Sequence, residues 1–231
     1  MRKTLEEREA RRLITGGPVV LVTTAWHGKK NVMPAAYVVP LSFEPPLIGV
    51  AVHPARHTHD MIRFSEEFAL NIPGRDLIHH VQYLGSVTGA EFDKFELTRL
   101  NTFKARKVEA PLIEGCVGYI ECGLDDALRV GDHTLFIGRV VAAQVETEAF
   151  EETWLLNDDD LKPLHYLGLN YYSILGSRLA AKVPKPAEEE PEKSLEEAAR
   201  EDLELGRKEE EKRREEEERR KSDEGPEGQA M

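Results

Sequence analysis

Three short apolar segments that follow one another closely restrict the fold of this chain more than any other feature. Residues 18–26 (PVVLVTTAW), 31–39 (NVMPAAYVV) and 47–53 (LIGVAVH) are rich in Val, Ile and Thr, as strands are. A His27-Gly28 turn separates the first two segments, and the irregular PLSFEPP separates the second from the third. These spacings leave no room for crossover helices. They therefore favour an antiparallel sheet over alternating βαβ units.

The rest of the body alternates between predicted helices and predicted strands. We expect a helix over 58–67 with Thr58 as its N-cap, and a second helix over 77–85 capped by Asp76. Residues 85–104 predict loops and a short helix. Two further strands, CVGYIECGL and HTLFIGRVVAAQVE, are predicted with DDALRVGD as their connection. The sequence is thus predicted to form a mainly β fold with inserted helices, a closed or nearly closed antiparallel barrel.

The charge of the chain is concentrated at its C-terminal end. Residues 184–231 contain 19 acidic and 11 basic residues, a net charge of −8, whereas residues 1–183 carry a net charge of −4. We therefore expect one folded domain over 1–183 and a charged, helical or disordered tail over 184–231. Five favourably oriented i,i+4 pairs, from Glu209–Arg213 to Glu217–Lys221, can support a solvated helix. The tail is interpreted as a solvated extension or as a partner-binding arm.

Several classes of protein are disfavoured by composition. The acidic balance argues against a nucleic-acid partner, which requires a clustered basic surface. No segment reaches the ~20 apolar residues of a membrane span, and the charged N-terminus does not resemble a signal peptide. We expect a cytoplasmic protein. Cys116 and Cys122 fall on one predicted strand, on the same side and roughly 20 Å apart, so they are expected to be buried apolar residues rather than a disulfide.

The segment VHPARHTHDMI, residues 52–62, has two interpretations. His53, His57 and His59 are potential metal ligands, although their spacing is weak evidence for a zinc site. Alternatively, a strand ends near His53 and a helix begins near Thr58, which places free backbone N–H groups where an anion can bind. Arg56 would add a forked cationic donor and Thr58 a hydroxyl. On these residues alone, a surface arginine beside an ordinary helix cap is an equally simple explanation.

A set of landmarks in a fixed order runs from residue 14 to residue 178. The landmarks are GPVVLVTT, NVMPAAYVVPLSFEPPLIGVAV, ARHTHDMIRFSEEFALNIP, DKFELT, GDHTLFIGRVV and HYLGLNYY. Together they resemble the flavin reductase-like, FMN-binding split-barrel family. That resemblance implies an antiparallel split β-barrel with FMN as cofactor. It favours the interpretation of residues 52–62 as a phosphate site, and it implies no metal site.

The resemblance also implies roles for residues of the second and third apolar segments. Ala35, Ala36 and Tyr37 would lie along the isoalloxazine ring, where small side chains allow backbone amides to reach its oxygen and nitrogen atoms. Tyr37 has an alternative role as a core aromatic. Ser42 would lie near the flavin or its ribityl chain, and a loop-capping role is the alternative.

The remaining implied residues surround the phosphate and the reactive part of the flavin. Arg56 and Thr58 would hold the FMN phosphate, and His57 occupies a position where related sequences often have Asp. Lys94 would approach the phosphate or the ring, unless it is an ordinary surface lysine. His133 is the candidate catalytic residue, because imidazole changes its charge near neutral pH; a structural histidine in a tight turn is the alternative.

The function implied is that of an NAD(P)H-dependent flavin oxidoreductase. FMN would accept electrons from NADH or NADPH and pass them to free flavin, a metal or a partner protein, and the protein would be a homodimer. The sequence contains no Gly-x-Gly-x-x-Gly fingerprint, so any nicotinamide would bind without a Rossmann domain. An FMN-carrying electron-transfer protein resembling flavoredoxin, without direct use of NAD(P)H, is the alternative. A scaffold that has lost its flavin is a third possibility.

Overall fold

The computed structural model describes residues 2, 4–181, 203, 204, 206–208, 212 and 214. The chain divides into two units, residues 1–177 and 178–231. In the second unit, the described positions from 203 onward are helical. The five charge pairs predicted for the tail each involve a position outside the described residues. Among the described residues, no helix is both long and apolar enough to cross a membrane.

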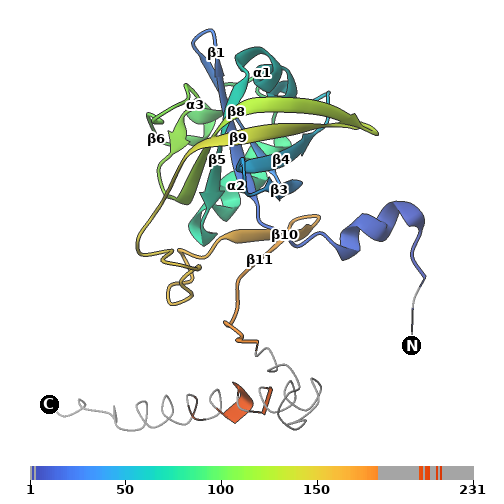
Figure 1. Ribbon diagram of the computed structural model, residues 1–231, viewed down its shortest axis with the longest axis vertical. Coiled ribbons are helices and arrows are strands. Elements are labelled where there is room, and N and C mark those ends of the chain that lie inside the picture. The colour runs from blue at the N-terminus through green and yellow to red at the C-terminus, as the bar shows by residue number, and fades with distance from the viewer. Residues whose placement is uncertain are drawn as a thin grey trace, which may run out of the picture. The chain divides into compact units, whose positions relative to one another are not determined.

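A curled antiparallel sheet of seven strands forms the centre of the first unit (Figure 1). The order of its strands is β2-β1-β5-β8-β9-β4-β3. The bounds are β1 Val20–Trp26, β2 Lys29–Ala35, β3 Val38–Ser42, β4 Leu47–Val52, β5 Glu67–Pro73, β8 Cys116–Val130 and β9 His133–Val145.

The two edges of this sheet are strands that follow each other in the sequence. Only Ala36 and Tyr37 separate β2 from β3, so the sheet must curl until its edges meet. No ladder joins β2 to β3 in the described sheet. The Ala51 N–H instead donates to the Tyr37 carbonyl at 2.9 Å and ties the linker to β4. The structure thus confirms an antiparallel split barrel with inserted helices.

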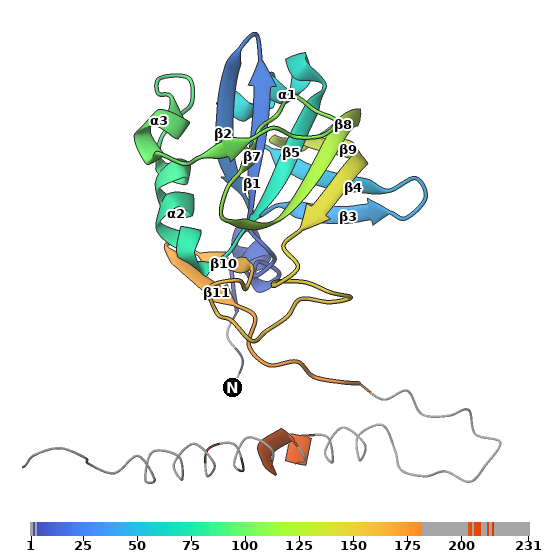
Figure 2. The ribbon, with the colours of Figure 1, turned by 90° about the vertical axis from the view of Figure 1, so that its left-hand side faces the viewer.

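The remaining elements surround the barrel. The 3₁₀ helix η1 (Glu7–Leu13) precedes β1, and α1 (His57–Ser65) packs against β1 and β5. The helices α2 and α3 pack against β2, as Figure 2 shows. Their bounds are η2 Arg75–Leu77 (3₁₀), α2 Ile78–Ser86 and α3 Lys94–Thr98, and the short strands are β6 Thr102–Phe103, β7 Leu112–Ile113, β10 Leu164–Gly168 and β11 Tyr171–Ile174.

Two apolar clusters explain why this sheet is stable. The inner cluster fills the barrel and contains Val20, Val22, Val50, Val52, Ile62, Phe68, Leu70, Cys122 and Phe136. The outer cluster lies under α2 and the segment around β7, and includes Leu21, Val32, Val81, Leu84, Leu112, Ile113, Cys116 and Leu164. Residues of β1 alternate between the two clusters, as the period of a strand requires.

The predicted break at residues 125–132 is wrong. Strand β8 continues to Val130 and pairs with β9 along its length, up to Val130 opposite His133. The Arg139 guanidinium bonds the Asp125 carboxylate across the two strands, at 2.5 Å from Nη2. The connection is the pair Gly131 and Asp132, with Gly131 at φ 61°, which suits a tight hairpin turn.

Both predicted helix caps are also wrong. Helix α1 begins at His57, with Arg56 at the N-cap position and no side-chain cap, so Thr58 lies inside its first turn. The buried Thr58 hydroxyl bonds Asn31 of β2 instead. Asp76 lies within the 3₁₀ turn η2 and caps nothing, and α2 begins at Ile78. In both cases a tertiary contact or a tight turn has taken the place of the local capping bond.

The two cysteines do not face the same side of β8. Ile72 pairs with Gly118 and Pro73 with Cys116, so Val117 is an extra residue, a β-bulge. The bulge reverses the alternation, and Cys116 joins the outer cluster whereas Cys122 joins the inner one. Both are free and buried, as expected. Burial raises the pKa of the Cys122 thiol to about 12 and that of Cys116 still further above its usual range.

Candidate functional site

The first turn of α1 presents a positively charged helix start. The chain leaves β4 at Val52 and turns through a bond from the Arg56 N–H to the His53 carbonyl, 2.9 Å. Arg56 is extended (φ −87°, ψ 131°), and the helix begins at the next residue. The first N–H groups of a helix have no partners within it, and the dipole makes that end positive. The exposed Arg56 guanidinium adds a full charge beside them.

A buried polar contact joins this helix start to the edge strand β2. The Asn31 Nδ2 donates to the Thr58 Oγ1 at 2.8 Å, and both side chains are 2% exposed. The Asn31 Oδ1 is buried and has no hydrogen-bond partner among the described residues. Gly89 lies directly over this amide, since a Cβ at position 89 would overlap the Asn31 Oδ1 and come within 3.2 Å of His57 Cδ2.

Lys94 provides a second cation at this place. Asp93 caps α3 by accepting from the Phe95 and Glu96 N–H groups at 2.9 and 3.1 Å, and so fixes the position of Lys94. The Lys94 side chain is 4% exposed, and its Nζ donates to the Leu84 carbonyl at 2.8 Å.

Lys94 lies in an environment where positive charge is not balanced by a carboxylate of the described residues. Burial, and then the positive charge of Arg56, lower the pKa of Lys94 from 10.5 to about 8. Within the described part of the chain, neither cation forms an ion pair with a carboxylate. Two neighbouring cations, a helix start and a hydroxyl are together suited to an oxygen-rich anion such as a phosphate monoester.

The lowered pKa of Lys94 predicts a dependence of stability on pH. The folded protein releases this proton near pH 8 and the unfolded chain near pH 10.5. Between these values the unfolded state binds more protons, so the stability of the folded state rises with pH. Below pH 8 the cost of the buried charge is fully present. The free energy of unfolding of the wild type, relative to that of Lys94→Met, should therefore rise between pH 8 and 10 by at most about 1.4 kcal/mol per pH unit.

Urea unfolding of both proteins without ligand at pH 7, 8, 9 and 10 measures this difference. The comparison with Lys94→Met cancels the titration of the other groups. A difference that stays constant over this range would show that Lys94 titrates normally in the folded protein.

The three histidines of residues 52–62 diverge into different surroundings. His59 is buried, with Nε2 2.9 Å from Thr134 Oγ1 and its ring against Phe136. His53 accepts from the Ala55 N–H at 3.0 Å, and half-buried His57 lies beside Gly89. In the described part of the chain, no group of three or more His, Cys, Asp or Glu side chains could hold a metal.

A cluster of rings lies next to the helix start. The His133 ring is 5.3 Å from that of His53 and 5.9 Å from that of Tyr37, centroid to centroid. The His133 Nδ1 lies 2.7 Å from the Asp132 carboxylate, and this hydrogen bond lowers the pKa of Asp132. Arg11 donates to the Tyr37 hydroxyl at 3.4 Å. The 41% exposed Tyr37 side chain is therefore not a core aromatic.

The other predicted flavin contacts fall at the open seam of the barrel. Ala35 ends β2 and Ala36 lies in the linker, both half-buried, next to Tyr37. Ser42 lies farther along the next strand. It ends β3 opposite Leu47, five residues beyond Tyr37, which is roughly 16 Å along an extended strand. The structure thus gathers Ala35, Ala36, Tyr37, Arg56, His57, Thr58, Lys94 and His133 around the seam and the start of α1.

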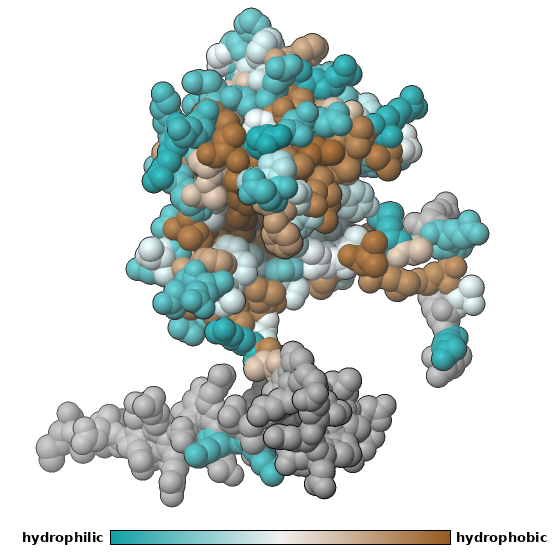
Figure 3. Space-filling view, in the orientation of Figure 1, coloured by the Kyte–Doolittle hydropathy of each residue, from teal (hydrophilic) through white to brown (hydrophobic). Residues whose placement is uncertain are grey.

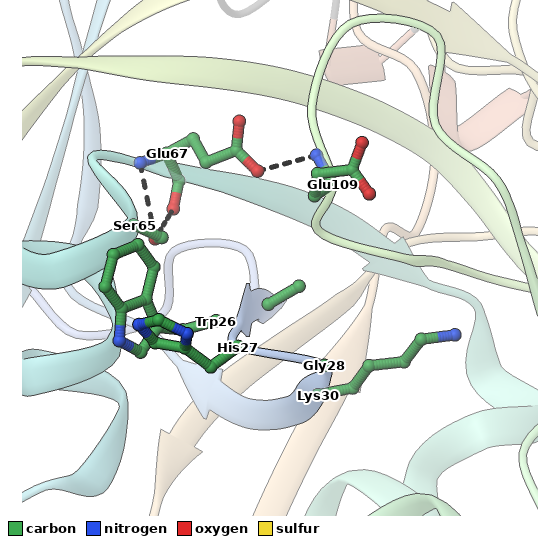
Figure 4. Close-up of a pocket in the computed structure, with 8 residues that line it drawn as sticks. Trp26, His27, Gly28, Lys30, Ser65, Glu67 and Glu109 are labelled. Atoms are coloured by element: carbon green, nitrogen blue, oxygen red, sulfur yellow. Dashed lines mark hydrogen bonds between the residues drawn. The ribbon is translucent and has the colours of Figure 1, made fainter.

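A hollow of about 360 Å³ lies elsewhere, at the tip of the β1–β2 hairpin. Its lining, drawn in Figure 4, is Ala25, Trp26, His27, Gly28, Lys30, Ser65, Glu67 and Glu109. None of the predicted flavin contacts belongs to it. The Glu67 carboxylate accepts from the Glu109 N–H there at 2.6 Å, which holds the loop before β7 in place. A hollow with two carboxylates at its wall does not suit a phosphate.

The sequence alone assigned no role to three residues of this site, although Asn31 is the first residue of one of the family landmarks. The contacts of Asn31 and Gly89 are tertiary, and such contacts leave no local pattern. Asp93 does have a local signal, because Asp93 and Glu96 are spaced as in a capping box, D-x-x-E. That spacing predicts the start of α3 at Lys94, where the structure has it.

Together, the split antiparallel barrel and the paired cations at the start of its first α-helix define a class of β-barrel proteins suited to a phosphate-bearing ligand at the seam. The chain belongs to the flavin reductase-like domain family, whose sequence model matches residues 11–174.

Relatives and solved structures agree with this assignment. The chain is 33% identical over 183 residues to the uncharacterised protein YddH of Escherichia coli, covering 77% of this chain and 96% of the relative. It is similar to the flavoredoxin of Desulfovibrio vulgaris (TM-score 0.69, 28% identity, covering 78% of this chain and 96% of that one). An FMN-binding protein from Thermus thermophilus gives TM-score 0.69 at 26% identity, covering 79% and 99%.

Proposed function

We propose that this protein is an FMN-dependent oxidoreductase that uses NADH or NADPH as electron donor. The observation that carries the proposal is the pair Arg56 and Lys94, two cations that have no carboxylate partner in the described part of the chain. Burial, and then the charge of Arg56, lower the pKa of Lys94. An FMN phosphate would neutralise both cations. Membership of the flavin reductase-like family and the likeness to an FMN-binding protein support the same cofactor.

The residues at the seam have separate tasks in this proposal. Arg56, Lys94 and the Thr58 hydroxyl bind the phosphate, and the first turn of α1 contributes its N–H groups. The small side chains of Ala35 and Ala36 allow the flavin ring to approach the backbone. When bound, FMN supplies the redox chemistry, accepting a hydride and passing electrons on. The protein orients the ring and excludes water from one of its faces.

His133 is proposed to hold or donate a proton near the flavin ring. Its Nδ1 faces Asp132 at 2.7 Å, which leaves Nε2 for a ligand. His133→Asn is therefore expected to slow reduction of bound flavin by less than about 100-fold, since a general acid contributes at the low end of its range when the cofactor carries out the transfer. Stopped-flow reduction with NADH measures the rate. An unchanged rate and an unchanged pH profile would show that His133 has a structural role and does not donate a proton to the flavin.

The proposed function is tested by one spectroscopic experiment. The purified protein is loaded with FMN, freed of excess flavin and mixed anaerobically with NADH or NADPH. We expect the flavin bands to be retained and then bleached by at least one nicotinamide. Retained bands that do not bleach would support an electron carrier reduced by a partner protein. Loss of the flavin on desalting would contradict the site itself.

An electron carrier is the second candidate function. The similarity to flavoredoxin, at 28% identity over 78% of this chain, favours it. The same phosphate site would serve both functions. They differ in whether a nicotinamide reaches the flavin or electrons arrive from a protein partner.

A homodimer is also proposed. Large apolar side chains are exposed along β3, the β3–β4 turn and the β8–β9 hairpin: Val39, Leu41, Phe43, Leu128, Val130 and Val141. Apolar side chains also gather on the face of the first unit shown in Figure 3. Patches of this kind are typical of interaction surfaces, and a second copy would cover the seam where the flavin is expected. Sedimentation equilibrium, which gives the mass in solution, tests this proposal.

A further inference from the structure

The hollow at the tip of the β1–β2 hairpin has no part in the proposed function. Its volume of about 360 Å³ is that of a pocket for a small ligand. Arg56 stands at the start of α1, whereas the hollow reaches Ser65, the last residue of the same helix. The lining contains two glutamates and one lysine. The hollow therefore has the size of a ligand site and more acidic than basic side chains.

The two carboxylates of the hollow have no cationic partner. The Glu67 Oε1 accepts from the Glu109 N–H at 2.6 Å, which is a neutral backbone donor. Within the described part of the chain, neither glutamate forms an ion pair, and neither does the exposed Lys30. Figure 4 shows Glu67 and Glu109 next to each other on one side of the hollow. Both negative charges are thus available to a cationic ligand.

The end of α1 adds negative potential at the same place. The last carbonyl groups of an α-helix have no partner within it, and the helix dipole makes that end negative. Helix α1 ends at Ser65, and Glu66 follows in the left-handed conformation. The helix that favours an anion at its start therefore favours a cation at Ser65.

An aromatic wall faces the two glutamates. The Trp26 side chain is 39% exposed, and its ring centroid lies 4.3 Å from that of His27 and 6.3 Å from that of Phe64. His27 and Gly28 have φ values of 49° and 77°, as a type I′ hairpin turn requires, and this turn holds the His27 ring against Trp26. Indole rings attract cations, and a flat guanidinium stacks on them.

We propose that this hollow is a second ligand site, which binds a small organic cation through a guanidinium group. The guanidinium lies against the Trp26 ring and donates to the carboxylates of Glu67 and Glu109. An ammonium group would meet the same charges, but it lacks the flat face and the forked donors that suit an indole and a carboxylate. The site does not depend on the proposed function, because it shares no residue with the flavin site.

Two tryptophans make the site directly observable by NMR. Trp26 lines the hollow, whereas Trp154 packs against Phe150 and does not line it. The full chain is labelled with ¹⁵N-tryptophan and titrated with agmatine, which is 4-aminobutylguanidine, and Trp154→Phe assigns the two indole N–H resonances. We expect the Trp26 resonance to shift with a dissociation constant on the order of 1 mM, while the Trp154 resonance stays in place.

A neutral isostere of the guanidinium is the control ligand. In 4-aminobutylurea the guanidinium is replaced by an uncharged group of the same shape, and the ammonium is kept. It should bind at least about fivefold more weakly than agmatine, the usual size of an exposed charge contact. No shift of the Trp26 resonance with agmatine, or equal affinities for the two ligands, would overturn the proposal.

Charge variants test the role of the glutamates. Glu109→Gln and Glu67→Gln each remove a charge while keeping the shape, and each should raise the dissociation constant for agmatine about fivefold. Glu114→Gln is the matched control, since Glu114 is exposed and does not line the hollow. Lys30→Met removes a like charge and should lower the dissociation constant about twofold. Equal effects of Glu109→Gln and Glu114→Gln would show a general attraction by an acidic protein and would overturn the site.

Trp26→Leu tests the aromatic wall. Binding to this variant is followed through the backbone amide resonance of Gly28, which also lines the hollow. The affinity for agmatine should fall about two- to fivefold, the usual size of an exposed cation–π contact. Wild-type affinity would contradict the placement of the guanidinium against the ring. Urea unfolding shows whether each variant is folded, and the exposed changes at Glu109 and Lys30 remain informative if Trp26→Leu does not fold.

Discussion

Replacing Arg56 by Ala should weaken FMN binding by about 10- to 100-fold, because a hydrogen bond to a charged group contributes roughly 1.5–3 kcal/mol. Riboflavin has no phosphate, so its affinity should change less than about twofold. Arg56 is exposed and caps the helix without a side-chain bond, and its loss should leave stability nearly unchanged. Fluorescence titration of both flavins with the ligand-free protein measures the effect.

Arg63→Ala is the matched control for this experiment. Arg63 is an exposed arginine in the last turn of the same helix, α1, so its removal changes the net charge equally at the other helix end. The FMN affinities of the two variants should also depend differently on salt, because added salt weakens the contact between Arg56 and the phosphate, and only Arg63→Ala keeps that contact. Equal losses of FMN affinity in both variants would indicate a general charge effect and no phosphate contact at Arg56.

Phe136→Ala should lower the free energy of unfolding by about 3–5 kcal/mol, the usual range for removing a buried aromatic side chain. Phe136 is fully buried in the inner cluster. The centroids of its ring and of the His59 ring are 5.1 Å apart in a T-shaped arrangement, so the change also removes an aromatic contact. Because most natural domains are stable by about 5–15 kcal/mol, the variant should retain its fold but unfold at a much lower urea concentration.

Phe43→Ala provides the comparison. Phe43 is 99% exposed in the turn between β3 and β4, and an exposed substitution should change stability by less than about 0.5 kcal/mol. Urea unfolding at low protein concentration measures both variants and limits any contribution from self-association. A Phe136 variant as stable as the Phe43 variant would mean that the inner cluster does not stabilise the barrel.

Local patterns in the sequence predict most of the elements and fail where tertiary contacts override them. The richness of residues 18–26 in Val and Thr correctly predicts β1. Thr58 and Asp76 have the right chemistry for helix caps, yet neither caps a helix. The bulge at Val117 places Cys116 on the opposite face of β8 from the one expected, because one extra residue shifts the alternation of side chains along a strand.

The candidate site divides in the same way. Arg56 and Thr58 were identified from a strand-to-helix junction, which is a local pattern, and Lys94 from a resemblance. Asn31 and Gly89 lie 27 and 31 residues from Thr58 in the sequence, and no local spacing connects them to it. The curl of the sheet and the packing of α2 and α3 against β2 bring them together.

The sequence by itself determined the β-rich barrel, the strand-to-helix junction between His53 and Thr58 and the division of charge between body and tail, because each depends on neighbouring residues and on composition. The tertiary structure decided which hydrogen bonds the buried polar groups make, how far β8 extends and which cation stands beside Arg56. These depend on contacts between residues distant in the chain. Such contacts exist only after the sheet has curled and brought its edge strands β2 and β3 towards each other.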